Sequence, residues 1–81
     1  MKVLYFAWLR ERIGKGSEEV EPSAATVADL VEELRARELR YEAAFEDTSA
    51  LRVAVDQTLT SFDAPLSGAR EVAFFPPMTG G

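Results

Sequence analysis

Apolar residues crowd both ends of the chain in short runs that predict β-strands. From residue 2 to residue 10 most positions are apolar, which is typical of a strand that is central or covered on both faces. A second run, residues 71–75, is followed directly by Pro76 and Pro77. Proline donates no backbone hydrogen bond, so we expect this strand to end there and the chain to leave the sheet. The first strand would carry Leu4, Phe6 and Trp8 on one face and Val3, Tyr5, Ala7 and Leu9 on the other.

The middle of the chain changes to a helical period. An apolar stripe at i, i+3, i+4 and i+7 consists of Val27, Leu30, Val31 and Leu34. Thr26 stands directly before this stripe and is expected to cap the helix, while Asp29 resembles the acid of a capping box. Further along, Tyr41, Ala44 and Phe45 indicate a short helical turn that places its rings under a loop.

The remaining segments predict two antiparallel strand pairs. A turn at residues 14–16 leads into an extended stretch around residues 18–21, and Asp56 with Gln57 forms a tight turn between strands 51–55 and 58–60. One main amphipathic helix is too few for a doubly wound fold. If the first and last strands form a parallel central pair, the crossover is right-handed. We therefore predict an α+β fold of the β-grasp, ubiquitin-like type, a mixed sheet with that helix packed on one face.

Composition excludes several classes of function. The chain has 81 residues, which suits one domain, and no apolar run approaches the about 20 residues of a membrane span. Histidine and cysteine are both absent, which removes thiolate nucleophiles and the usual zinc ligands. A formal net charge of -5 is the wrong sign for nucleic-acid binding. We expect a cytoplasmic protein that binds neither nucleic acid nor membrane, holds no metal, and meets a basic protein surface.

The final residues are the strongest candidate for chemistry. Gly80 and Gly81 follow the apolar, proline-stiffened stretch 72–79. Glycine has no Cβ, so such an end could thread a narrow channel and present its α-carboxylate to another protein. From Pro77 to Gly81 the extended reach is roughly 15 Å, at about 3.3 Å per residue. We expect a β-grasp domain over residues 1–76 and a flexible C-terminal Gly-Gly tail over residues 77–81.

An apolar patch is the second candidate site. On strand parity, Phe6, Trp8 and Phe75 would share a face of the sheet with Leu59, either exposed as a docking surface or covered by loops or the helix. Parity alone does not decide between these two. The stretch Gly14-Lys15-Gly16 lacks the spacing of a phosphate loop and is interpreted as a turn. The acidic residues around positions 18–21 and 46–47 are interpreted as solvated surface.

Several motifs together resemble the small, sulfur-carrier subunits of molybdopterin synthase, a family of ubiquitin-like proteins. The resemblance lies in residues 2–7 with 9–11, Thr26-Val27, residues 55–59 and 61–63, Pro65-Leu66, residues 71–77 and the end Thr79-Gly80-Gly81. It covers nearly the whole chain. Three departures from the family pattern stand out: Asp56 where asparagine is common, Met78 in place of a smaller branched residue, and no acid after Gly68 in Gly68-Ala69-Arg70.

The resemblance implies a sulfur carrier that is not an enzyme on its own. An ATP- and magnesium-dependent adenylating enzyme similar to ubiquitin-activating enzymes would activate Gly81, and a sulfur donor protein would convert it to a thiocarboxylate. Met78, Thr79 and Gly80 would insert into the large subunit, where sulfur passes to cyclic pyranopterin monophosphate to build molybdopterin. Phe6, Leu59 and Phe75 would contact the large subunit in a heterotetramer, and the chain itself would bind no cofactor.

Other functions share parts of this pattern. A thiamine-pathway sulfur carrier also ends in Gly-Gly, although those relatives usually are shorter and lack the Phe-Phe-Pro-Pro approach. A ubiquitin-like protein modifier would join Gly81 to lysines of other proteins. In a plain interaction module the tail would be inert.

Overall fold

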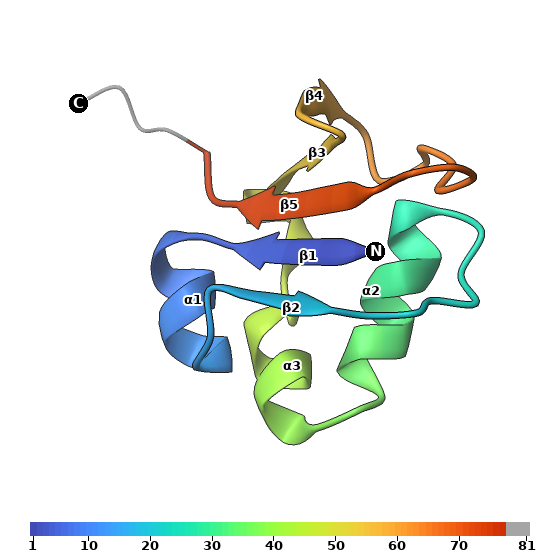
Figure 1. Cartoon of the computed structure of the whole chain (residues 1–81). Coiled ribbons are helices and arrows are strands. Elements are labelled where there is room, and N and C mark those ends of the chain that lie inside the picture. The colour runs from blue at the N-terminus through green and yellow to red at the C-terminus, as the bar shows by residue number, and fades with distance from the viewer. Residues whose placement is uncertain (78–81) are drawn as a thin grey trace.

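A parallel pair of strands, β1 (Lys2–Tyr5) and β5 (Glu71–Phe75), forms the centre of the sheet. The computed structural model describes residues 1–77 of the chain. The strands lie in the order β2-β1-β5-β3-β4, and β2 (Ser17–Glu19), β3 (Arg52–Val55) and β4 (Thr58–Thr60) each run antiparallel to their neighbours (Figure 1). This confirms the predicted mixed sheet, with the first and last strands side by side.

The first strand is shorter than predicted, because residues 7–13 form helix α1 (Ala7–Ile13). The prediction of one strand from Lys2 to Arg10 is therefore wrong after Tyr5. Phe6 is still extended, but Ala7 has a φ of 54° and turns the chain out of the strand direction. Leu9 and Ile13, four residues apart, bury one face of the helix, and Gly14 ends it with a φ of 90°. Strands β1 and β2 are consequently joined through a helix and not by a tight hairpin.

Helix α2 (Val27–Arg35) is the amphipathic helix that the sequence predicts. The Thr26 hydroxyl accepts a hydrogen bond from the Asp29 backbone N–H at 3.2 Å, which satisfies one of the free donors of the first turn. All four residues of the predicted stripe are buried, namely Val27, Leu30, Val31 and Leu34. The helix start and the face it buries are both confirmed.

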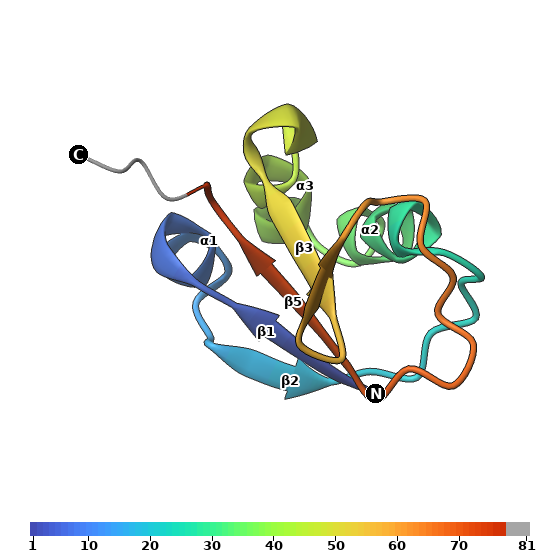
Figure 2. The same cartoon turned by 90° about the horizontal axis from the view of Figure 1, so that it is seen from above.

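The core lies between one face of the sheet and the helices (Figure 2). Helix α3 (Leu39–Ala44) and a 3-10 turn, η1 (Thr48–Ala50), complete this layer, and the predicted burial of Tyr41, Ala44 and Phe45 is confirmed. The rings of Phe45 and Phe74 meet edge to face, with centroids 5.2 Å apart. Such aromatic pairs hold α3 against the centre of the sheet.

A largely buried carboxylate, Glu18 on β2, connects the sheet to α3. Its Oε2 accepts hydrogen bonds from the hydroxyls of Tyr5 and Tyr41, both at 2.7 Å. Its Oε1 lies 3.5 Å from Lys15 and 3.6 Å from Arg37. Burial alone would raise the pKa of Glu18, but these hydrogen bonds and positive charges outweigh it and hold the pKa below its ordinary value. Burial and the bond to Glu18 raise the pKa of both tyrosines.

The β3–β4 hairpin turns at Asp56 and Gln57, as predicted. Both residues have positive φ, 49° and 68°, which is the geometry of a type I′ turn. Asp56 Oδ1 accepts hydrogen bonds from the backbone N–H groups of Arg70 and Glu71, at 2.9 and 3.0 Å. Asp56, one of the three departures from the family pattern, thus connects the hairpin to the start of β5 through its side chain.

Candidate functional site: an apolar face beside the root of the tail

The face of the sheet that points away from the helices carries a row of apolar side chains. In the strand register Leu4 lies opposite Ala73, Ala73 opposite Ala54, and Ala54 opposite Leu59. Their neighbours along the strands, such as Val3 and Val72, are fully buried on the other face. We call this side of the sheet the docking face. Sequence reasoning did not single out Ala54 and Ala73, although the alternation within β3 and β5 contained the signal.

The predicted interface residues Phe6, Leu59 and Phe75 all belong to the docking face. Leu59 is 66% exposed and Phe6 is 47% exposed, so both large apolar side chains are accessible to a partner. Phe75 is half-buried and lies opposite Arg52 of β3. The Phe6 backbone N–H donates to the carbonyl of Phe74, so Phe6 stays beside the end of β5. Strand parity left open whether this patch is exposed or covered by loops or the helix. In the structure it is exposed.

Trp8 does not belong to this patch, which corrects the parity argument. It lies on α1, packs partly against the core, and carries the Arg12 guanidinium 4.9 Å above its ring centre. The physical reason is the turn at Ala7, after which the period changes from two to 3.6 residues and side chains no longer alternate between faces.

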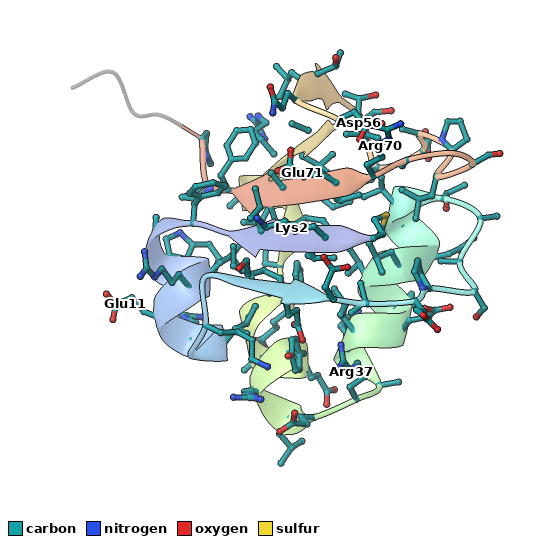
Figure 3. The ribbon with its side chains drawn as sticks, viewed as in Figure 1. Lys2, Glu11, Arg37, Asp56, Arg70 and Glu71 are labelled. Carbon is teal, nitrogen blue, oxygen red and sulfur yellow. The ribbon has the colours of Figure 1, made fainter. Side chains whose placement is uncertain are left out.

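The opposite end of the docking face is charged. Lys2 lies across from Glu19 on one side and from Glu71 on the other, and Figure 3 shows Lys2 and Glu71 next to each other on adjacent strands. Phe6 and Phe75 therefore lie where β5 ends, with Arg52 beside them, whereas Lys2, Glu19 and Glu71 lie where β5 begins. A partner seated on the apolar part would be placed close to the point at which the chain leaves the sheet.

Strand β5 ends at Phe75, and Pro76 and Pro77 follow as coil. Neither proline has an N–H to continue the ladder, which agrees with the predicted exit from the sheet. The predicted tail residues Met78, Thr79, Gly80 and Gly81 lie outside the described residues, as does most of the tail segment 77–81, so the tail boundary stays a prediction.

Three groups with displaced pKa values lie away from the docking face. The displaced pKa values of Tyr5, Glu18 and Tyr41 belong to the core side of the sheet. Within residues 1–77 no three carboxylates converge in a way that could hold a metal ion. In that same part of the chain, no helix has the length and apolar character needed to cross a membrane.

Comparison with known proteins identifies the relatives of this chain. The ThiS family matches residues 3–81. The molybdopterin synthase sulfur carrier subunit of Escherichia coli is 48% identical over 81 residues, covering 100% of this chain and 99% of the relative. The Haemophilus influenzae protein of the same name is 37% identical with the same coverage. The structure of SAMP1 from Haloferax volcanii has the same fold, with a TM-score of 0.77 at 24% identity and coverage of 100% and 98%. The chain therefore belongs to the ThiS family, together with the molybdopterin synthase sulfur carrier subunits.

Proposed function

We propose that this protein is the sulfur carrier subunit of a molybdopterin synthase and is not an enzyme on its own. The observation that carries this proposal is the similarity to two proteins of that name, at 48% and 37% identity along the whole chain. The docking face supports it, because a carrier must present an apolar contact surface to the protein that takes its cargo.

In this proposal the working group is the α-carboxylate of Gly81. An ionised carboxylate does not react with nucleophiles at neutral pH, so the activating enzyme uses ATP and magnesium to form the acyl adenylate. A sulfur donor protein then replaces AMP with sulfur to give a thiocarboxylate. The large subunit passes this sulfur to cyclic pyranopterin monophosphate in the biosynthesis of molybdopterin. The nucleotide and the magnesium ion are bound by the activating enzyme, and this chain supplies the acyl group.

The docking face and the tail would act together in the synthase. Phe6, Leu59 and Phe75 would contact the large subunit, while Met78, Thr79 and Gly80 would reach into it. Two large and two small subunits would form a heterotetramer. The end of β5 at the proline pair supports this division, because the tail root lies at the apolar part of the docking face.

The first experiment tests the chemistry at Gly81. The full chain is incubated with activating enzyme, ATP, magnesium and a sulfur donor, and its intact mass is recorded. We expect the exchange of one oxygen for sulfur in a fragment that contains Gly81. A variant with one alanine added after Gly81 is the control and should stay unmodified. Failure of the natural chain to gain sulfur, or equal gain by the extended one, contradicts the proposal.

The second experiment tests the docking face with a matched pair of variants. Leu59→Asp places a charge at an apolar contact and should weaken binding to the large subunit at least about tenfold. Leu39→Asp is the control, because Leu39 is 82% exposed but lies on α3, which packs against the other face of the sheet. Equal affinity of the two variants in calorimetry would contradict the assignment of the docking face.

The same proteins can be used to test whether the chain is a sulfur carrier or a protein modifier. A modifier would place Gly81 in an isopeptide bond with lysines of other proteins, which peptide mass spectrometry of a cell extract detects. A sulfur carrier instead restores molybdopterin synthesis when it is mixed with the large subunit after loading with sulfur.

A further inference from the structure

Strand β2 is an edge of the sheet whose outer side is open. Its hydrogen bonds to β1 use the residues at even positions: the Gly16 carbonyl accepts from Tyr5, and Val20 exchanges bonds with Met1. In an antiparallel pair the alternate residues point away from the partner strand. The backbone groups of Ser17 and Glu19 therefore point outward, and both residues are exposed. Within residues 1–77 no hydrogen bond from a turn, a loop or a side chain reaches these backbone groups.

A hollow of about 240 Å³ lies directly beside this edge, between the end of β2 and α2. Its accessible apolar surface comes from Val20 and Pro22, which are half-buried, whereas Leu30 and Leu34 of α2 lie beneath and are only 1% exposed. Its rim carries the acidic residues Glu21 and Glu33, whereas the Glu19 carboxylate lies 3.5 Å from the N-terminal ammonium group of Met1. The hollow therefore combines a small apolar surface with an acidic rim.

The one cation of the hollow, Arg37, is already engaged elsewhere. Its guanidinium lies 3.6 Å from Glu18 and 5.3 Å from the ring centre of Tyr41, and Figure 3 shows it between α2 and α3. With Glu19 paired to the Met1 ammonium group, two carboxylates, those of Glu21 and Glu33, against one guanidinium leave a formal charge of -1 around the hollow. The charge that would complement this hollow is positive.

We propose that the edge of β2 binds an extended segment of a partner protein that carries lysine or arginine. The segment adds a strand to the sheet through the outward backbone groups of Ser17 and Glu19. One of its basic side chains enters the hollow, with the methylene stem along Val20 and Pro22 and the charged end beside Glu21 and Glu33. Because β2 and β4 are opposite edges of the sheet, this site is separate from Leu59 and leaves the docking face free.

The test is a titration of the ¹⁵N-labelled full chain with the peptide acetyl-Val-Lys-Val-Lys-Val-amide, followed by NMR up to millimolar concentration. We expect shift changes at residues 17–22 and 30–37, slower amide exchange at Ser17 and Glu19, and weaker binding at high salt. The matched control is the peptide with glutamate in place of lysine, which should not bind. Changes centred on the docking face, no changes at all, or equal binding of both peptides overturn the proposal.

Two variants separate strand addition from simple attraction to an acidic surface. Ser17→Pro removes an outward N–H and leaves the bonds to β1 intact, so it should fold normally and lose binding at least tenfold. Glu21→Gln should weaken binding severalfold, whereas Glu42→Gln on α3 should not. Undiminished binding by a folded Ser17→Pro variant overturns the proposal. If that variant does not fold, unchanged amide exchange at Ser17 and Glu19 in the natural chain overturns it instead.

Discussion

Replacing Glu18 by glutamine should destabilise the protein more than any other single carboxylate-to-amide change in residues 1–77. Glu18 accepts two tyrosine hydroxyl bonds of 2.7 Å, and its side chain is only 9% exposed. The amide keeps the shape and one acceptor oxygen but loses the charge. The change therefore tests how much the charge contributes to holding β1, β2 and α3 together.

The expected loss follows from the contacts of the two oxygens. A hydrogen bond to a charged group contributes about 1.5–3 kcal/mol and a neutral one about 0.5–1.5 kcal/mol, so two weakened bonds cost about 2 kcal/mol. The pairs with Lys15 and Arg37 are partly exposed and add at most about 1 kcal/mol. At about 4–8 °C per kcal/mol for a domain of this size, a loss of about 2–3 kcal/mol lowers the melting temperature by roughly 8–24 °C.

Urea denaturation at several pH values, followed by the fluorescence of Trp8, measures this loss. Because the folded pKa of Glu18 lies below its ordinary value of 4.5, its contribution is complete above that value and is lost as pH falls through the folded pKa. The natural chain and Glu18→Gln should therefore differ at neutral pH and converge as the pH falls below the folded pKa of Glu18. Glu11→Gln, at an exposed position of α1, is the control. A Glu18→Gln variant as stable as the control at pH 7, or one whose deficit does not shrink in acid, would show that the Glu18 charge does not stabilise the fold.

Three smaller predictions use the same denaturation assay. Ala7→Gly should stabilise the protein by about 0.5–1 kcal/mol, because glycine adopts a φ of 54° without a Cβ clash. Thr26→Ala should cost about 1 kcal/mol through loss of the α2 cap, and Thr26→Ser should restore most of it. Asp56→Asn should stay within about 1 kcal/mol of the natural chain, because asparagine tolerates positive φ and keeps the acceptor oxygen.

Each of these has an outcome that contradicts it. A destabilised Ala7→Gly variant would mean that the turn at the end of β1 is not strained. Equal stability of the alanine and serine variants at position 26 would show that the hydroxyl cap does not stabilise α2. For Asp56, the comparison is with Asp56→Ala, which loses both hydrogen bonds and should cost about 1–2 kcal/mol. If the asparagine variant is as unstable as the alanine variant, the carboxylate charge and not its geometry holds the turn.

The sequence predicts best those elements whose apolar pattern is regular and whose first and last residues carry a clear start or stop signal. Helix α2 has four buried positions in one stripe and a threonine cap, and β5 is bounded by Arg70 and Pro76. Helix α1 was missed because residues 7–9 are apolar in a run too short to distinguish a period of two from one of 3.6. What decides the matter is the backbone conformation of Ala7, which no side-chain pattern indicates.

The candidate site likewise contains residues that the sequence could predict and residues that only the structure shows. Leu59 and Phe75 lie in segments that were correctly predicted as strands. Because side chains alternate between the two faces of a strand, their common face could be predicted from their positions. The contribution of Leu4, Ala54 and Ala73 depends on the register between strands that are far apart in the chain. Register is a tertiary property, fixed when the core faces of β1, β3 and β5 pack together.

An apolar face left open to solvent has to be kept from joining with copies of itself. The row Leu4, Ala73, Ala54 and Leu59 would favour such pairing, since its four members are apolar and lie across four adjacent strands. Two features oppose it. Charged Lys2, Glu19 and Glu71 border the row on one side, and the net charge of -5 makes copies repel each other. A partner with a basic rim around an apolar centre meets neither obstacle, so the same charges that prevent self-association favour a different protein on this face.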